Sequence, residues 1–208
     1  MERILNDIER LTNSEIREVV DSRVKEFKAV GRRLDHEIFC ELCFCIMTAN
    51  FNAERSIQIQ NEIKHGFCDL TEAELAKRLR ELGHRFPEAR AKYIIEARKH
   101  IGSLKSLMER FTNENELRDW LAKNVKGLGY KEASHFLRNI GYENVAIIDF
   151  HIIDVLVKYA IIERPKTLTP KKYLEIEATL KKLADRLKMT LAELDLYLWY
   201  METGKVLK

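Results

Sequence analysis

Lys131 and Asp149 are the two residues whose types and positions could carry out a reaction. Lys131 comes two residues after a pair of closely spaced glycines, Gly127 and Gly129, and Asp149 ends the apolar run 145–148. A lysine amine can attack an electron-poor sugar carbon and form a Schiff base. A nearby carboxylate stabilises the cationic transition state of such an attack. The two side chains therefore predict covalent catalysis, provided that the fold brings them to one site.

The segment around Lys131 predicts a tight turn between two helices. Gly127 and Gly129 flank one apolar residue, so the backbone can adopt positive φ and no side chain blocks a ligand. Apolar residues at helical spacing precede and follow the turn. Free N–H groups and the dipole of the second helix would form an anion site, which suits a phosphate. An ordinary turn between two helices explains the glycines equally well.

Residues 125–133 resemble the helix-hairpin-helix of the DNA glycosylase superfamily that includes endonuclease III. The pattern of that motif runs Leu-Pro-Gly-Val-Gly-x-Lys-x-Ala, and this chain has Val-Lys-Gly-Leu-Gly-Tyr-Lys-Glu-Ala. The resemblance places Lys131 on the nucleophilic lysine of the family. It places Asp149 on the catalytic aspartate of the downstream Val-Asp-x-His pattern, here Ile-Asp-Phe-His. Two departures, Lys126 for the usual proline and Phe150 after the aspartate, remove no reacting group.

A closer resemblance covers almost the whole chain. Residues 41–51, 131–139 and 204–208 are similar to the prokaryotic 8-oxoguanine glycosylase/lyase family, the second Ogg type. This resemblance implies excision of oxidised guanine from damaged double-stranded DNA, followed by strand cleavage through β-elimination. It also implies an all-α fold with two helical lobes and a cleft for the extruded nucleotide. The expected lobes are 1–30 plus 150–208 and 31–149, with the helix-hairpin-helix at about 117–140.

The resemblance also suggests which residues contact DNA. Gly127, Gly129 and Lys126 would hold a phosphate at the hairpin, and hairpin carbonyls could bind a monovalent ion. Asn50 matches a position that fills the gap left by the extruded base, although it could equally be a helix C-cap. Arg85 lies in a glycine turn that commonly faces the substrate in the superfamily, and a plain turn between helices is the alternative.

Three further residues are expected to recognise the damaged base. Phe86 and Trp199 could stack on it, and core packing is the alternative for each ring. The resemblance implies that the terminal carboxylate of Lys208 reaches the pocket. 8-Oxoguanine carries an N7–H donor that guanine lacks, so an acceptor there would discriminate between them. A frayed tail is the alternative for Lys208.

Composition is compatible with this interpretation without proving it. The chain has 208 residues, of which 46% are hydrophobic, and no apolar run long enough to span a bilayer, so we expect it in the cytoplasm, associated with the nucleoid. We also expect a monomer. The net charge is only +3, so attraction to DNA must come from local basic clusters. The basic residues that could form them are Arg85, Arg90, Lys92, Lys126, Lys131 and Arg138.

The cysteines predict neither disulfides nor a metal centre. Cys40, Cys43 and Cys45 share one apolar stretch and Cys68 stands apart, so all four are expected to be core thiols. Endonuclease III relatives often carry a C-terminal four-cysteine iron–sulfur loop, and this chain has no cysteine after Cys68. We expect no iron–sulfur cluster, and the chemistry assigned to Lys131 and Asp149 requires no cofactor.

Nearly the whole chain is expected to be helical, with no alternating strand pattern. Capping boxes are expected at Thr12, Thr71 and Thr190, each with Glu three residues later, and a further start at Thr169 before proline. The expected helices are 2–11, 14–30, 36–49, 53–65, 72–82, 87–100, 103–110, 114–124, 130–140, 150–162, 170–186 and 191–202.

Two other functions remain open from the sequence alone. Pocket residues could select a different damaged base, or the chain could be a non-catalytic helix-hairpin-helix module that binds DNA. In such a module Lys131 would only clamp a phosphate and Asp149 would only cap the helix that follows it.

Overall fold

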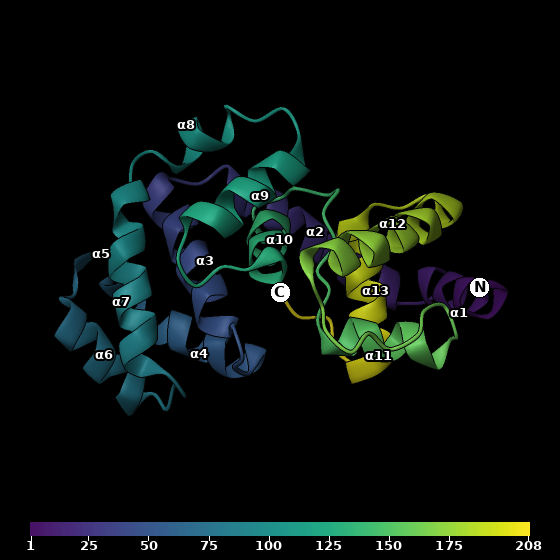
Figure 1. Ribbon diagram of the computed structural model, residues 1–208, viewed down its shortest axis with the longest axis horizontal. Coiled ribbons are helices and arrows are strands. Elements are labelled where there is room, and N and C mark those ends of the chain that lie inside the picture. The colour runs from purple at the N-terminus through teal and green to yellow at the C-terminus, as the bar shows by residue number, and fades with distance from the viewer. The chain divides into compact units, whose positions relative to one another are not determined.

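Helices make up all the regular secondary structure of the computed structural model, which describes residues 1–208 (Figure 1). The all-α prediction is confirmed. The helices are α1 (Glu2–Thr12), α2 (Ile16–Gly31), α3 (Asp35–Thr48), α4 (Ala53–Ile63), α5 (Gly66–Asp69), α6 (Glu72–Glu81), α7 (Pro87–Ala97), the 3-10 helix η1 (Arg98–His100), α8 (Leu104–Met108), α9 (Glu114–Asn124), α10 (Tyr130–Asn139), α11 (Phe150–Lys158), α12 (Pro170–Leu187) and α13 (Leu191–Thr203).

Most of the predicted helix starts are confirmed. Thr71 and Thr190 form complete capping boxes with Glu74 and Glu193, and the Thr169 side chain caps α12. The capping box at Thr12 is wrong. α1 continues through Thr12, whose hydroxyl donates back to the Glu9 carbonyl, and α2 begins only at Ile16. The sequence also missed α5, because four residues are too few to show a helical period.

The chain forms two compact units. We call Met1–Ala29 with Leu137–Lys208 the terminal unit, and Val30–Phe136 the central unit. The predicted lobes instead changed at 30/31 and 149/150. Residues 137–149 go with the terminal unit because Arg138 pairs with Asp195 of α13, and because α12 side chains bind the backbone at Ala146 and Ile148. The assignment of functional lobes stays a prediction.

α3 is the core helix of the central unit. Its side chains from Ile38 to Thr48 are buried apart from the half-buried Cys40, so the helix is covered on every side. Helices α4, α5, α7 and α8 pack against it. The end of α3 is therefore fixed by neighbours before the chain reaches Asn50.

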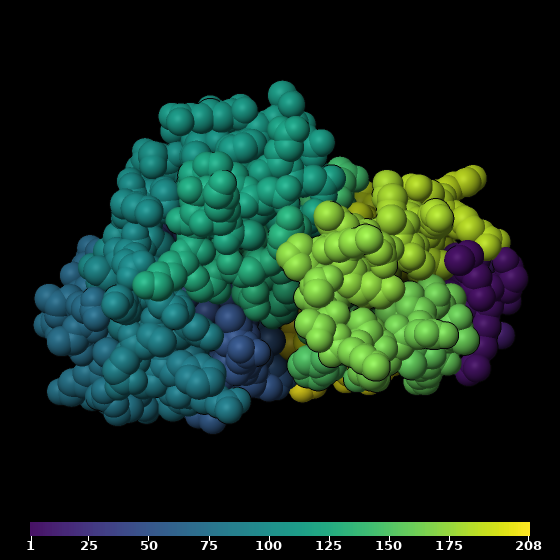
Figure 2. All heavy atoms as spheres, in the orientation of Figure 1, coloured from purple at the N-terminus to yellow at the C-terminus, as the bar shows by residue number.

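α13 has the same place in the terminal unit. It packs against α1, α11 and α12, and buries residues 191, 192 and 194–198 (Figure 1). Figure 2 shows the purple atoms of α1 beside the green and yellow atoms of the C-terminal helices. None of the helices combines the length and apolar character that crossing a lipid bilayer requires.

Candidate functional site

The hairpin between α9 and α10 confirms the predicted helix, turn, helix unit and packs on α7. Gly127 has φ +91°, and a Cβ there would lie 2.7 Å from Cδ2 of Tyr93, so no larger residue fits without displacing that ring. The Lys126 Nζ atom lies 5.3 Å from the centre of the same ring and 3.1 Å from Oε1 of Glu96. The hairpin is thus held by a tyrosine face and an ion pair, both from α7.

Lys131 lies in the first turn of α10, and its neighbour Glu132 ties it to the hairpin. Oε1 of Glu132 is 3.7 Å from Nζ of Lys131, and Oε2 accepts the Gly129 N–H at 3.2 Å. Gly129 precedes the first residue of α10, so this contact involves the turn and not the first N–H groups of the helix, whose binding of a phosphate stays a prediction. The Gly129 N–H is used by a glutamate at the position where capping-box acids act. The Lys131 side chain is 22% exposed, so its amine is sheltered but reachable.

The loops that carry Asn50, Arg85 and Phe86 belong to the same central unit. Asn50 is exposed at the end of α3 with φ +56°, a left-handed conformation that asparagine tolerates. Arg85 is exposed and Phe86 half-buried, just before α7. The Arg85 guanidinium lies 4.9 Å from the centre of the Phe86 ring. Exposed polar side chains beside an aromatic ring suit contact with nucleic acid.

Two of the basic residues expected at a DNA surface are buried instead. Arg90 donates to the Ala49 carbonyl, and burial lowers the pKa of its guanidinium. Arg138 forms an ion pair with Asp195 and hydrogen bonds to Asn139. Both guanidinium groups thus bind acceptors inside the protein. Arg85, Lys92 and Lys126 remain exposed and Lys131 half-buried.

Asp149 is the N-cap of α11 in the terminal unit. Its Oδ1 atom accepts the Ile152 N–H at 3.0 Å, and Oδ2 lies 3.1 Å from Nδ1 of His151. The carboxylate therefore faces the N-terminal, positive end of the α11 helix dipole. The carboxylate that the resemblance makes catalytic is also a structural cap.

The extended segment before Asp149 is held by α12. The Ala146 N–H donates to Glu177 at 2.7 Å, the Ile148 N–H donates to the Tyr173 hydroxyl at 3.2 Å, and that hydroxyl donates to the Ala146 carbonyl at 2.7 Å. These side chains replace the partners that a neighbouring strand would supply. Asp149 is thus fixed from both sides, by α11 after it and α12 before it.

Aromatic rings gather beside Asp149. The centre of the His151 ring lies 3.8 Å from the centre of the Phe150 ring. It lies 4.4 Å from the centre of the Trp199 ring, in an edge-on arrangement. Trp199 is half-buried, whereas Phe150 is 64% exposed although it is a large apolar residue. Lys208 is half-buried after the end of α13. The predicted site residues are thus divided between the two units. The terminal unit carries Asp149, Trp199 and Lys208. The central unit carries Lys131 and the predicted residues of the hairpin, the Asn50 loop and the turn before α7.

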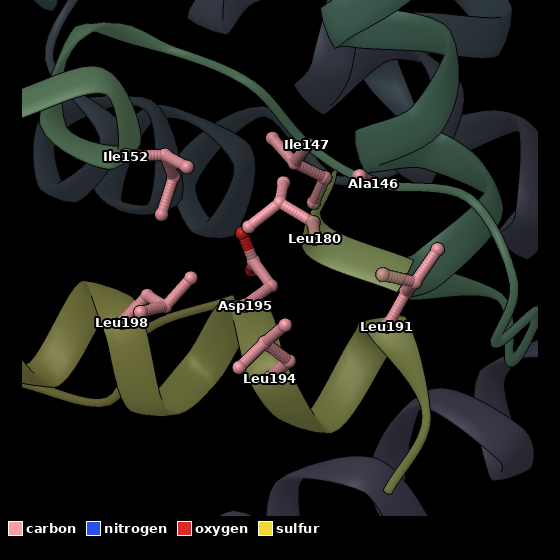
Figure 3. A pocket seen from close by; sticks show the side chains of 8 residues that line it. All are labelled: Ala146, Ile147, Ile152, Leu180, Leu191, Leu194, Asp195 and Leu198. Atoms are coloured by element: carbon pink, nitrogen blue, oxygen red, sulfur yellow. The ribbon is translucent and has the colours of Figure 1, made fainter. Parts of the chain in front are cut away.

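A small cavity in the terminal unit involves none of these residues. It is lined by apolar side chains and one carboxylate: Ala146, Ile147, Ile152, Leu180, Leu191, Leu194, Asp195 and Leu198 (Figure 3). The carboxylate, from Asp195, is paired with Arg138. This lining makes the cavity a packing gap between α12, α13 and the 146–147 segment.

Cys43 and Cys45 are core thiols as predicted, whereas Cys40 and Cys68 are only half-buried. The Cys40 thiol donates to the Lys64 carbonyl, and burial together with Cys68 raises its pKa to about 12. Burial likewise keeps the pKa of Cys43 well above its usual value. No group of three or more histidine, cysteine or acidic side chains is arranged to hold a metal ion.

Some residues that shape the site were missed by sequence reasoning. Glu132 could have been found, because a glutamate three residues after a helix-starting glycine is a capping signal. His84, Tyr173 and Glu177 act on backbone groups far away in the chain, and no local pattern marks them.

Comparison with known proteins agrees with this geometry. A family model described as 8-oxoguanine DNA glycosylase matches residues 20–189. An 8-oxoguanine DNA glycosylase/AP lyase from Korarchaeum cryptofilum is 53% identical, over 99% of this chain and 98% of the relative.

Solved structures show the same fold. The Methanocaldococcus jannaschii 8-oxoguanine glycosylase/lyase, in complex with a 15mer DNA containing 8-oxoguanine, superposes with a TM-score of 0.96 at 51% identity, covering 99% of this chain and 100% of that one. The Thermotoga maritima 8-oxoguanine DNA glycosylase gives a TM-score of 0.92 at 44% identity, over 100% and 99% of the two chains. The chain therefore belongs to the 8-oxoguanine DNA glycosylase family.

Proposed function

We propose that this chain excises 8-oxoguanine from double-stranded DNA and then cleaves the strand, with Lys131 as the nucleophile. The observation that carries the proposal is the match to the Methanocaldococcus jannaschii enzyme, which extends over nearly the whole of both chains. The structure of that enzyme is a complex with DNA containing 8-oxoguanine. The half-buried amine of Lys131 beside the hairpin supports the same assignment.

Lys131 acts first in this mechanism. Its neutral amine attacks C1′ of the damaged nucleotide, the C1′–N9 bond breaks, and its electrons leave with the base. The attacking nitrogen loses a proton, and Glu132 is the nearest carboxylate to receive it. Opening of the sugar ring gives a Schiff base. That imine acidifies the C2′ proton, and its removal expels the 3′ phosphate by β-elimination.

Asp149 stabilises the positive charge that develops on the sugar as the base departs. A fixed carboxylate is effective because it needs no reorganisation during the reaction. Its hydrogen bonds to Ile152 and His151 provide that fixed orientation. Stabilisation of this kind is typically worth a factor of about 10² to 10³ in rate.

DNA contact and base choice belong to other residues. Gly127, Gly129 and Lys126 approach a phosphate, while Asn50 and Arg85 contact the strands around the gap. Phe86 and Trp199 stack on the extruded base, and the Lys208 carboxylate accepts its N7–H. Removal of Lys208 is expected to weaken selection against guanine more than DNA binding, whereas unchanged selectivity would exclude the carboxylate role.

Borohydride trapping tests the central claim. Borohydride reduces a Schiff base to a stable amine, so wild-type protein should become covalently attached to duplex DNA containing 8-oxoguanine. Lys131→Gln should form no adduct and still bind the duplex. Lys77→Gln is the matched control, because it removes the same charge from an exposed position on α6 of the same unit.

The alternatives give different results. Release of another damaged base in preference to 8-oxoguanine would keep the chemistry and change the substrate. Binding without base release or adduct would indicate a non-catalytic module. An adduct that survives in Lys131→Gln would assign the nucleophile to another amine.

A further inference from the structure

His84 is a buried histidine, 4% exposed, and both of its ring nitrogens are engaged by main-chain groups. Nε2 lies 3.1 Å from the Met47 carbonyl oxygen, and Nδ1 lies 3.0 Å from the Phe86 nitrogen. The ring also packs on Phe51 with 4.2 Å between centres. One side chain therefore contacts the end of α3, the loop after it and the start of α7.

These partners fix the protonation state of the ring. A carbonyl oxygen can only accept, so Nε2 must carry a hydrogen, and a backbone N–H can only donate, so Nδ1 must be bare. His84 is therefore neutral in a single tautomer. Burial lowers the pKa of His84, and the nearby Arg90 charge lowers it further.

The two main-chain partners border the loops assigned to DNA contact. Met47 is in the last turn of α3, three residues before the exposed Asn50. Phe86 is itself the N-cap of α7, and its N–H donates to His84. The two loops are more than thirty residues apart in sequence, and the His84 side chain contacts main-chain groups of both.

Arg90 makes a second connection between the same loops. From α7 it donates to the carbonyl of Ala49, the residue before Asn50, and its guanidinium lies 5.5 Å from the centre of the Phe86 ring. The buried side chains of His84 and Arg90 thus both contact the two loops. Asn50 and Arg85, in the same loops, are exposed.

We propose that His84 is a positioning residue that holds the Asn50 loop and the Phe86 turn at a fixed separation, so that the two engage DNA around the extruded nucleotide together. The inference rests on the proposed function, which assigns Asn50 and Phe86 to DNA contact. It predicts that His84 matters for extracting and holding the damaged base, and much less for lyase chemistry at a site whose base is already missing.

Three substitutions separate the contributions of the ring. His84→Phe keeps the packing on Phe51 and loses both hydrogen bonds. His84→Gln places an amide N–H near the Nε2 position and retains the donor to Met47. His84→Asn places an amide oxygen near the Nδ1 position and retains the acceptor for Phe86.

The measurement compares two single-turnover rates for each variant. Excision from an 8-oxoguanine duplex should fall by between about tenfold and a hundredfold in His84→Phe, since small misplacements cost that much. Schiff-base trapping on a duplex with a ready-made abasic site should change by less than about threefold. His84→Gln and His84→Asn should recover part of the lost excision rate.

His100→Phe is the matched control, because it makes the same change at a half-buried histidine packed on Trp120. This variant should leave the ratio of the two rates at the wild-type value. Melting temperatures and circular dichroism show which variants are folded at the assay temperature.

The outcomes are distinct. A selective loss of excision in His84→Phe supports the proposal. An equal loss of both rates, or no loss in folded protein, overturns it and leaves His84 as a purely structural residue. If wild-type protein neither releases 8-oxoguanine nor forms an adduct, the proposed function fails, and the role of His84 with it. Nitrogen NMR shifts that place the His84 proton on Nδ1 would also overturn the proposal.

Discussion

Glu132 joins Lys131 to the hairpin: its carboxylate lies 3.7 Å from the Lys131 Nζ atom and accepts the Gly129 N–H at 3.2 Å. The proposed nucleophile is therefore oriented by the same side chain that caps the start of its own helix. The hairpin and the proposed nucleophile therefore share one contact, the carboxylate of Glu132.

Glu132→Ala is expected to slow Schiff-base formation about tenfold, as is common when a side chain that orients a reacting group is lost. The variant releases both Gly129 and Lys131. Glu132→Gln should recover only part of that loss, because its amide oxygen can still accept the Gly129 N–H but cannot take up the proton from Lys131. Trapping rates on a ready-made abasic site provide the measurement. Equal rates in both variants and wild type would show that the hairpin orients Lys131 without Glu132.

The double role of Asp149 can be separated with Asp149→Asn. Asparagine is as good an N-cap as aspartate, so the free energy of unfolding should change by less than about 0.5 kcal/mol. The excision rate should fall by about 10² to 10³, because the neutral amide cannot stabilise the developing cation. Asp149→Ala should lose about 1 kcal/mol of stability as well.

Denaturant unfolding and single-turnover excision, measured on the same preparations, distinguish the two roles of Asp149. Full activity in Asp149→Asn together with lower stability in Asp149→Ala would mean that this residue is only a helix cap. Loss of activity at unchanged stability would support charge stabilisation.

The sequence predicted the parts of this molecule that depend on local patterns. Capping residues located most helices, and the glycine spacing located the hairpin, since each signal acts over a few residues. The fate of Arg90 and Arg138 could not be predicted in this way. Arg138 forms an ion pair with Asp195, 57 positions away in the sequence, and Arg90 donates a hydrogen bond to the carbonyl of Ala49, 41 positions away. Whether a guanidinium binds DNA or a buried acceptor depends on such long-range packing.

Phe150 is expected to contact DNA, because this large apolar residue is 64% exposed and lies directly after Asp149. In a Lys131→Gln background, Phe150→Ala should weaken binding to an 8-oxoguanine duplex by roughly fivefold or more, as expected for loss of one stacking contact. Leu34→Ala is the control, since Leu34 is 63% exposed in the central unit and has no assigned role. Fluorescence anisotropy measures both dissociation constants. If both variants bind like the parent, Phe150 is simply an exposed residue.

Mild acid is expected to destabilise the protein partly through the buried His84 and the half-buried His100. Burial lowers the pKa of His84, with Arg90 adding to the effect, and burial and Lys99 lower the pKa of His100. In the unfolded chain both rings take up a proton near pH 6.5, whereas in the folded state they do so only at lower pH. The unfolded state therefore binds more protons below that pH. Stability from these groups is complete above about pH 6.5 and is lost as the pH falls.

His84→Gln cannot titrate at this position, so its free energy of unfolding should fall less between pH 7.5 and 5.5 than that of the wild type. Guanidinium chloride unfolding at the two pH values measures this difference, and the carboxylates that also titrate are common to both proteins. His100→Gln should flatten the dependence in the same direction. A pH dependence that is identical in all three proteins would show that these rings keep the same proton occupancy when the chain unfolds.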